Sequence, residues 1–321
     1  MGPDTEFVSG SGYKDLLAIS CHELFHTWNI KNIRPVEMMP YDFSKENYSE
    51  LGYVAEGVTT YYGDNLLYRT GQFTEAEWME ELQKLVQEHL WNDGRFNLSV
   101  AQSSLETWLD GYGAGIPWRK VSIYNEGSLL TFISDSIIKR ATSNAKSMDD
   151  VMRIMYERFG KKGIGYSADD YQKILEEVSG VSFQKLFDQL YRGIADYTPY
   201  ILEALDFNGY QLMEAPSSKS SEADFGMGLD ESGNRPSISM VSKDSAADDA
   251  GLWYGDEIIT IDGVQPYKNV QSMLRAIETK AEIVYLRKNE MKTTVLEKTG
   301  KTYLKRYFVE RKSSMTSSTE G

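Results

Sequence analysis

The sequence predicts an α+β protein in which a mainly α-helical domain precedes a small β-rich domain. Apolar residues recur at helical spacing through about the first 200 residues, whereas towards the C-terminus they alternate with period two. Between these regions, residues 215–222 are polar and poor in bulky apolar side chains, which is typical of a linker. We therefore expect a helical domain over 1–205, a linker over 206–222, a β-rich domain over 223–300 and a tail over 301–321.

The helical domain is expected to open with a helix over residues 13–29, where apolar side chains from Leu16 to Trp28 recur at helical spacing. Two prolines, Pro35 and Pro40, then indicate a loop. Thr74 and Glu77 form a capping box that predicts the start of another helix, which reaches about residue 90. The remaining helices are expected over residues 48–68, 123–140, 148–159 and 183–191, and in a segment opened by Ser167 and Asp170.

The β-rich domain is expected to contain strands over residues 237–241, 257–261, 281–287 and 292–296. Two short helices fit between them, over residues 246–250 and 270–278. The last residues, 312–321, are rich in Ser and Thr and are expected to be disordered.

The charge balance and the hydropathy pattern narrow the choice of partners. The net charge is −14 and no basic run is present, so a nucleic acid is not an expected partner. No stretch approaches the roughly 18 apolar residues of a membrane span. Residues 1–12 have neither the basic nor the apolar region of a signal peptide, which suggests an irregular lead and leaves the compartment open. The single cysteine, Cys21, allows no internal disulfide and is expected to be a small buried hydrophobic residue.

His22, Glu23 and His26 form an H-E-x-x-H motif on the first predicted helix. A spacing of four residues places both imidazoles on one helix face, where they can bind one metal ion. Nitrogen ligands and one further protein ligand favour zinc, which keeps a position open for water. The water bound to zinc has a pKa of about 7, and an adjacent carboxylate can take its proton. Glu23 is the candidate for that general base.

The third zinc ligand has two candidates, His89 and Glu56. His89 lies near the C-terminus of an amphipathic helix, where a cation simply interacts favourably with the helix dipole. Glu56 follows three mostly apolar residues inside a helix, where a charge needs a partner. Gly57 comes next and is unfavourable in a helix, which suggests close approach of another backbone or of the metal. We therefore predict Glu56 as the ligand, with a structural ion pair as the alternative.

Thr60 and Asp64 lie one and two helical turns beyond Glu56 on the same face. Either side chain could orient a metal-binding histidine through its second ring nitrogen. The alternative for each is an ordinary polar group on a helix surface.

Two segments of the chain resemble the M61 family, the glycyl aminopeptidase group of the gluzincins. They are residues 22–35, HELFHTWNIKNIRP, and residues 55–64, AEGVTTYYGD. The resemblance implies a thermolysin-like catalytic domain, one zinc ion per chain and Glu56 as third ligand. It also implies cleavage after small N-terminal residues such as glycine.

The family has a tyrosine in a Tyr-x-Lys-Gly block that helps to stabilise the oxyanion of the reaction. Tyr124 occupies that place in the sequence YNEG (124–127), so the resemblance assigns it the same role. Glu126 replaces the family's lysine and reverses the local charge. The alternative is a tyrosine that simply begins a helix.

The resemblance also implies a C-terminal PDZ domain. Residues 224–229, DFGMGL, resemble a carboxylate-binding loop, and residues 250–263 are close to the PDZ core pattern. The candidate loop residues are Phe225, Gly226, Met227 and Gly228. Such a loop beside a strand edge could accept a peptide C-terminus by strand addition. The alternative is a module that only packs against the peptidase.

Full-length family members carry a large β-rich N-terminal region whose Gly-Gly-Leu-Glu-His-like motif is thought to hold the substrate's N-terminus. Nothing in this sequence matches that motif. We therefore expect the chain to bind zinc but to cleave glycyl substrates weakly, and to leave exposed the helix face that the missing strands would cover.

The leading hypothesis is a zinc metallopeptidase, an aminopeptidase acting on peptides or proteins. One alternative is a noncatalytic PDZ scaffold with a structural metal site, and intact Glu23 weighs against it. Another is an endopeptidase with the same zinc chemistry. Residues 111–115, GYGAG, suggest a flexible loop near the cleft.

Overall fold

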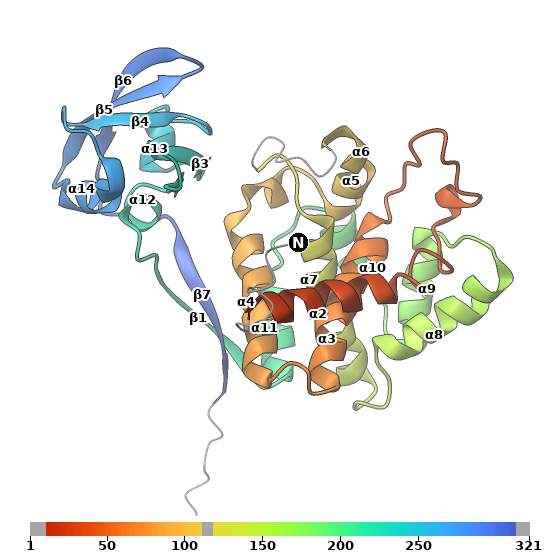
Figure 1. Cartoon of the computed structure of the whole chain (residues 1–321). Helices are drawn as coiled ribbons and strands as arrows, with labels where there is room; N and C mark the ends of the chain where they lie inside the picture. Colours follow the sequence, from red (N-terminus) through yellow and green to blue (C-terminus); the bar gives the residue numbers. More distant parts are fainter. Residues whose placement is uncertain (1–10, 111–117, 313–321) are drawn as a thin grey trace, which may run out of the picture. The chain divides into compact units, whose positions relative to one another are not determined.

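The computed structural model describes residues 11–110 and 118–312, and its chain divides into two compact units (Figure 1). The first unit comprises Met1–Leu212 with Val309–Gly321, and the second comprises Met213–Phe308. None of the helices in the described ranges is both long and apolar enough to span a membrane.

The first unit is helical, as the sequence predicts. Its α-helices are α2 (Ser11–Phe25), α3 (Thr59–Arg69), α4 (Glu75–Trp91), α5 (Val100–Leu105), α6 (Thr107–Asp110), α7 (Ile123–Ala141), α8 (Met148–Arg158), α9 (Ala168–Ser179), α10 (Gln184–Leu186) and α11 (Thr198–Phe207). Two π-helices, η2 (Tyr53–Val58) and η5 (Phe187–Tyr191), and the 3-10 turns η1 (Val36–Met38), η3 (Asp93–Phe96) and η4 (Gly160–Lys162) complete it.

The ends of these helices follow the capping chemistry of the sequence. The predicted capping box at Thr74 is present, with the hydroxyl accepting from Glu77 N–H, and Ser167 caps α9 in the same way. The helix expected over 13–29 ends earlier, at Phe25, because tighter turns follow it, with the Thr27 N–H bonded to Leu24 O and the Trp28 N–H bonded to Phe25 O. The helix expected over 48–68 begins as the π-helix η2 and continues as α3. Helices α5 and α11 were not expected.

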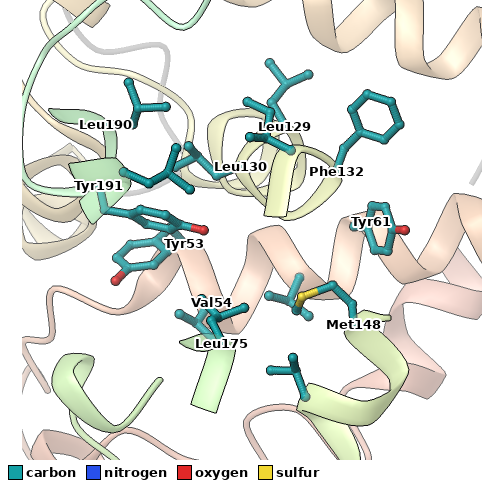
Figure 2. Close-up of a cluster of buried hydrophobic side chains, with 14 of the residues drawn as sticks. Tyr53, Val54, Tyr61, Leu129, Leu130, Phe132, Met148, Leu175, Leu190 and Tyr191 are labelled. Atoms are coloured by element: carbon teal, nitrogen blue, oxygen red, sulfur yellow. The ribbon is translucent and has the colours of Figure 1, made fainter. Parts of the chain in front are cut away.

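Helix α7 lies at the centre of the first unit and contacts η2, α3, α4, α9 and α11. Figure 2 shows Leu129 and Leu130 of this helix in a cluster of buried side chains that includes Tyr53 and Val54 of η2. The ring of Tyr53 lies 5.1 Å from that of Tyr191, measured between centroids. Burying such aromatic and aliphatic side chains is the main stabilising contribution to folding.

The second unit contains a five-stranded antiparallel sheet in the order β2-β3-β4-β5-β6. Its strands are β2 (Met227–Asp230), β3 (Ser237–Val241), β4 (Glu257–Ile261), β5 (Lys280–Arg287) and β6 (Glu290–Glu297). Its helices are α12 (Ser220–Ala223), α13 (Ala246–Asp249) and α14 (Val270–Ala276), with the 3-10 turn η6 (Tyr267–Asn269). The four expected strands and two expected helices are present, and β2 was not expected.

Two boundaries differ from the sequence-based expectation. Residues 206–222 are not a free linker, because they contain the end of α11, strand β1 (Tyr210–Pro216) and most of α12. Glu222 is buried there and accepts hydrogen bonds from Ser217 Oγ and Arg306 Nη2, contacts that polarity alone does not reveal. The predicted tail over 301–321 contains β7 (Lys305–Arg311), which pairs with β1. The predictions for residues 111–115, 1–10 and 313–321 lie outside the described residues.

A candidate metal centre

Helix α2 carries His22 on the side that contacts α3, and His26 follows directly after its last residue. The His26 N–H donates to His22 O, so the two histidines are one turn apart. Their rings are perpendicular, with centroids 4.7 Å apart. Gly63 of α3 lies opposite His22, where an added Cβ would be 3.5 Å from His22 Cβ, an ordinary van der Waals contact. Ligand atoms of His22, Glu23 and His26 all lie within 4.8 Å of one another. The H-E-x-x-H motif therefore forms a compact cluster, as the helical spacing requires.

Glu56 of the π-helix η2 completes this cluster. Its Oε2 atom lies 3.3 Å from His22 Nε2 and 3.2 Å from His26 Nε2. That oxygen is buried and has no aligned hydrogen bond among the described residues. An orphaned carboxylate oxygen between two imidazole nitrogens is unfavourable unless a cation binds there. Two imidazoles and one carboxylate form the donor set of a catalytic zinc site, so these residues fit the metal that the sequence implies.

The remaining ring nitrogens of the two histidines point away from Glu56. His26 Nδ1 is 3.1 Å from Asn29 O and 3.5 Å from Thr59 Oγ1. Because a backbone carbonyl only accepts, the proton of a neutral His26 belongs on Nδ1, which leaves the Nε2 lone pair for a metal. His22 Nδ1 lies 3.5 Å from Thr60 Oγ1, so Thr60 is the neighbour of that ring nitrogen, as predicted.

The electrostatics of Glu56 favour the ionised carboxylate. Burial alone would raise the pKa of Glu56, but the two imidazoles outweigh burial and lower it to about 2. Burial lowers the pKa of His26, and the contact with Glu56 reverses this to a net increase. The Glu56 carboxylate is therefore ionised at neutral pH and can bind a metal ion.

Glu23 and Tyr124 both lie near His22. Glu23 is exposed on α2, where its carboxylate can reach solvent beside the cluster. Tyr124, in the first turn of α7, has its ring stacked on that of His22, with centroids 6.1 Å apart. The structure thus brings the predicted base and the predicted oxyanion donor to the same pair of histidines.

Asp64 does not contact a histidine ring nitrogen in the described part of the chain. It lies instead beside the apolar side chains of Trp78, Leu82 and Leu85. Burial, with a contribution from Glu81, raises its pKa to about 7. Any effect of Asp64 on His22 is therefore electrostatic and at longer range than that of Thr60.

Sequence reasoning missed the role of Asn29, which joins the two ligand-bearing elements. Its Nδ2 atom donates to Val54 O at 2.7 Å and to Ala55 O at 3.1 Å, at the turn that carries Glu56. Its backbone oxygen meets His26 Nδ1. The residue is fully buried, although its Oδ1 has no hydrogen-bond partner in residues 11–110 and 118–312. In the sequence, the signal that could have indicated this role is an asparagine that closely follows the motif.

The structure also gives a partner to Glu126, which stands where the resemblance implies a lysine. Glu126 is buried and its two carboxylate oxygens lie 2.8 and 2.9 Å from Nδ1 of His89, which is also buried. The His89 ring stacks on Tyr197. His89 is therefore the partner of Glu126 and not a residue that only faces a helix dipole, and it does not join the metal cluster.

The four residues of the predicted carboxylate-binding loop, Phe225, Gly226, Met227 and Gly228, are all buried. The Gly226 N–H already donates to Glu222 O. Gly226 has φ +71°, and a Cβ there would lie 2.4 Å from Cβ of Ser245. The loop is therefore closely packed, and its glycine is required by both conformation and space.

The chain is similar to known proteins in part of its sequence and in its fold. Residues 15–130, which include all the residues of the candidate centre, match the model of the M61 glycyl aminopeptidase family. The crystal structure of an aminopeptidase N family protein from Idiomarina loihiensis superposes with a TM-score of 0.84 at 24% identity.

That superposition covers 95% of this chain and 54% of the Idiomarina chain, so the present chain spans about half the length of that protein. A photosystem II D1 C-terminal processing protease aligns over 55% of this chain and 44% of its own, at 15% identity, with a TM-score of only 0.24. No curated protein sequence matches the chain.

Proposed function

We propose that this protein is a zinc-dependent peptidase. The observation that carries the proposal is that His22 Nε2 and His26 Nε2 lie 3.3 and 3.2 Å from the orphaned Glu56 Oε2, with the Glu23 carboxylate close to both histidines. The match of residues 15–130 to a peptidase family supports the same class of reaction. The substrates would be peptides or proteins.

A zinc ion bound by these three residues would act as a Lewis acid towards water and the scissile carbonyl. Glu23 would accept the proton of the attacking water on its carboxylate and transfer it to the leaving amine. The Tyr124 hydroxyl would donate a hydrogen bond to the carbonyl oxygen as negative charge develops on it. Thr60 and the backbone oxygen of Asn29 would hold the two imidazoles in orientation.

Metal analysis with a ligand variant tests this proposal. We expect one zinc per chain after gentle purification, hydrolysis of peptide bonds that chelation abolishes, and loss of both in His22→Ala. A protein that retains zinc without any hydrolysis would instead favour the noncatalytic scaffold with a structural metal site. Absence of metal in the intact protein would contradict both.

Within this class, we propose an aminopeptidase that favours small N-terminal residues such as glycine. The description of the matched family, glycyl aminopeptidase, supports this preference. Glycyl, alanyl and leucyl chromogenic substrates give the order of specificity, and N-acetylated peptides provide the control. Efficient cleavage of the acetylated peptides would favour an endopeptidase with the same residues.

For the second unit, we propose a PDZ-like module in which β2, at the edge of the sheet, adds a peptide strand. Helix α12 contacts both β2 and α14. Titration with C-terminal peptides and with their amides tests the module. Equal binding of both forms, or none, would leave it only a packing role.

A further inference from the structure

An open groove lies in the first unit where the loop after α2 meets the connection between α8 and α9, both visible in Figure 1. The two segments are joined by hydrogen bonds from Tyr166 N to Arg34 O and from Val36 N to Tyr166 O. Gly165 permits this contact, because a Cβ there would lie 2.3 Å from Val36 Cα. The groove has a volume of about 650 Å³, within the range of ligand sites.

The floor of this groove carries a guanidinium with no acidic partner. Arg34 donates from Nε to Ile30 O and from Nη2 to Lys31 O, and its Nη1 lies 3.6 Å from Met39 Sδ. These contacts fix the side chain and use three of its five N–H groups. No carboxylate pairs with Arg34 in residues 11–110 and 118–312, although the chain carries 48 Asp and Glu.

Two further cations lie around the same groove. Lys31 is held to Arg34 through its carbonyl, and Lys162 immediately precedes the lining residue Gly163. The Gly160 turn approaches Asn32, which places the two lysine-bearing loops together. Both lysines are exposed, and no ion pair involves either within the described ranges. Three cations therefore lie at or next to the lining residues of the groove. Asp42 lies between two lining residues, and it pairs with Lys45 at 3.7 Å.

The rest of the groove is apolar and exposed. Phe43 is 93% exposed, Val36 48% and Ile164 49%, and the ring of Tyr41 lies 4.7 Å from that of Phe43. The Arg34 guanidinium lies over the ring of Tyr41, 6.0 Å from its centroid. Apolar side chains around a cation without an acidic partner suit a ligand that joins a carboxylate to a hydrophobic group.

We propose that this groove binds the C-terminal carboxylate of a peptide, with its last side chain apolar and packed against Phe43 and Ile164. The assignment to a peptide rests on the proposed peptidase function and on connectivity to the metal centre. Arg34 Nη2 bonds Lys31 O, and the Lys31 N–H bonds His26 O, so two hydrogen bonds separate the guanidinium from a metal-binding residue. The groove would thus make the enzyme prefer short peptides with a free C-terminus.

Equilibrium binding of N-acetyl-phenylalanine and of its amide to the full chain tests the proposal without requiring activity. We expect the acid to bind on the order of tenfold more tightly than the amide, because one charge-assisted contact separates them. Lys162→Glu and Arg34→Met should abolish this preference. Phe43→Ala should weaken both ligands equally, since it removes only apolar contact.

Lys185→Glu on α10 is the matched control, because it makes the same charge change on an exposed lysine that, unlike Lys162, is not adjacent in sequence to any lining residue. It should retain the preference for the acid. Since Arg34 also supports its own loop, Lys162→Glu keeps the test valid if Arg34→Met fails to fold. Equal binding of acid and amide by the unaltered protein would overturn the proposal. Binding of octanoate as tight as that of the peptide acid would assign the groove to fatty acids instead.

Kinetics then separate this inference from the proposed function. If the peptidase proposal holds, kcat/KM for Gly-Gly-Phe should exceed that for its amide, and Lys162→Glu should remove the difference through KM. Absence of hydrolysis with an intact acid preference would contradict the peptidase alone. Hydrolysis without any acid preference would contradict the groove alone.

Discussion

Gly57 and Gly127 touch backbone to backbone, which fixes the π-helix that carries Glu56 against the helix that carries Tyr124. A Cβ on Gly127 would lie 2.5 Å from Tyr53 O and 2.7 Å from Gly57 Cα. No side chain fits between the two elements. The metal ligand and the candidate oxyanion donor therefore share one rigid contact.

Gly127→Ala should disrupt this contact. We expect a loss of about 1–3 kcal/mol in the free energy of unfolding, because backbone must move to admit the methyl group. Zinc affinity should fall as well, since η2 shifts with Glu56. Urea unfolding and zinc titration provide the measurements. Gly233→Ala is the control, because the nearest atom to its Cβ is 3.5 Å away. Unchanged zinc affinity in a destabilised Gly127→Ala would show that the contact serves stability only.

Glu23→Gln should retain zinc and the fold but lose hydrolysis by about 10²–10⁴-fold in kcat/KM. The amide preserves the shape of the side chain but cannot accept the proton of water. Metal content and kcat/KM on a glycyl substrate are the two measurements. A variant that lost its zinc would assign Glu23 to metal binding.

Glu56→Ala should lose zinc affinity far more than Asp64→Asn does. Glu56 Oε2 lies 3.2–3.3 Å from the Nε2 atoms of both histidines, whereas Asp64 interacts with His22 only by longer-range electrostatics. A change next to the ligands typically costs 10–100-fold in metal affinity, and Asp64→Asn should remain at or below that range. Competition with a chelator measures both values. A larger loss in Asp64→Asn would show that the ligand assignment is wrong.

Asn29→Asp should weaken metal binding by about 10–100-fold, although the two side chains have the same shape. A carboxylate cannot donate to Val54 O and Ala55 O, so the turn that presents Glu56 loses its support. Asn32→Ala, on the same loop but bonded only to Thr27 O through Nδ2, should keep its metal affinity. Equal affinity in Asn29→Asp and the unaltered protein would reduce Asn29 to a packing role.

Asp149 is not a candidate metal ligand, and its surroundings predict that the stability of the protein depends on pH. Burial would raise its pKa, but hydrogen bonds from Arg69 and Tyr62 outweigh burial and lower it. A lowered folded-state pKa stabilises the protein above the unfolded value of about 3.9, and this contribution disappears as the pH falls through the folded value. Asp149→Asn should therefore cost about 1 kcal/mol at pH 7 and progressively less below pH 4. A cost that is constant with pH would contradict the ionic origin.

The sequence predicted the fold class because its helix signals are local. The Thr74 and Ser167 caps and the period of α7 need no tertiary information. Strands β1 and β7 were missed because their pairing joins residues almost a hundred positions apart. Nothing local indicates such a partner.

The candidate metal site was likewise predictable where its signals are local in sequence, and not where they depend on distant residues. His22 and His26 are one turn apart, so their common face could be predicted, and Glu56 was indicated by a charge in an apolar helix. The π-turn that aims Glu56 and the support from Asn29 depend on contacts across 25 residues. The pairing of Glu126 with His89 spans 37 residues, which explains why the replaced lysine could not be interpreted from sequence.

Strands β1 and β7 make the second unit an insertion within the covalent order of the first. Residues before and after the insertion form hydrogen bonds with helix α4. The Tyr210 hydroxyl bonds to Glu75, and the Val309 N–H bonds to Gln83 Oε1. A polypeptide that ended after residue 205 would therefore lose both hydrogen bonds. A short turn in place of residues 213–308 would keep them, because the two paired strands already bring its ends together. We therefore expect that the β-rich unit can be gained, lost or replaced in evolution without disrupting the fold of the helical unit.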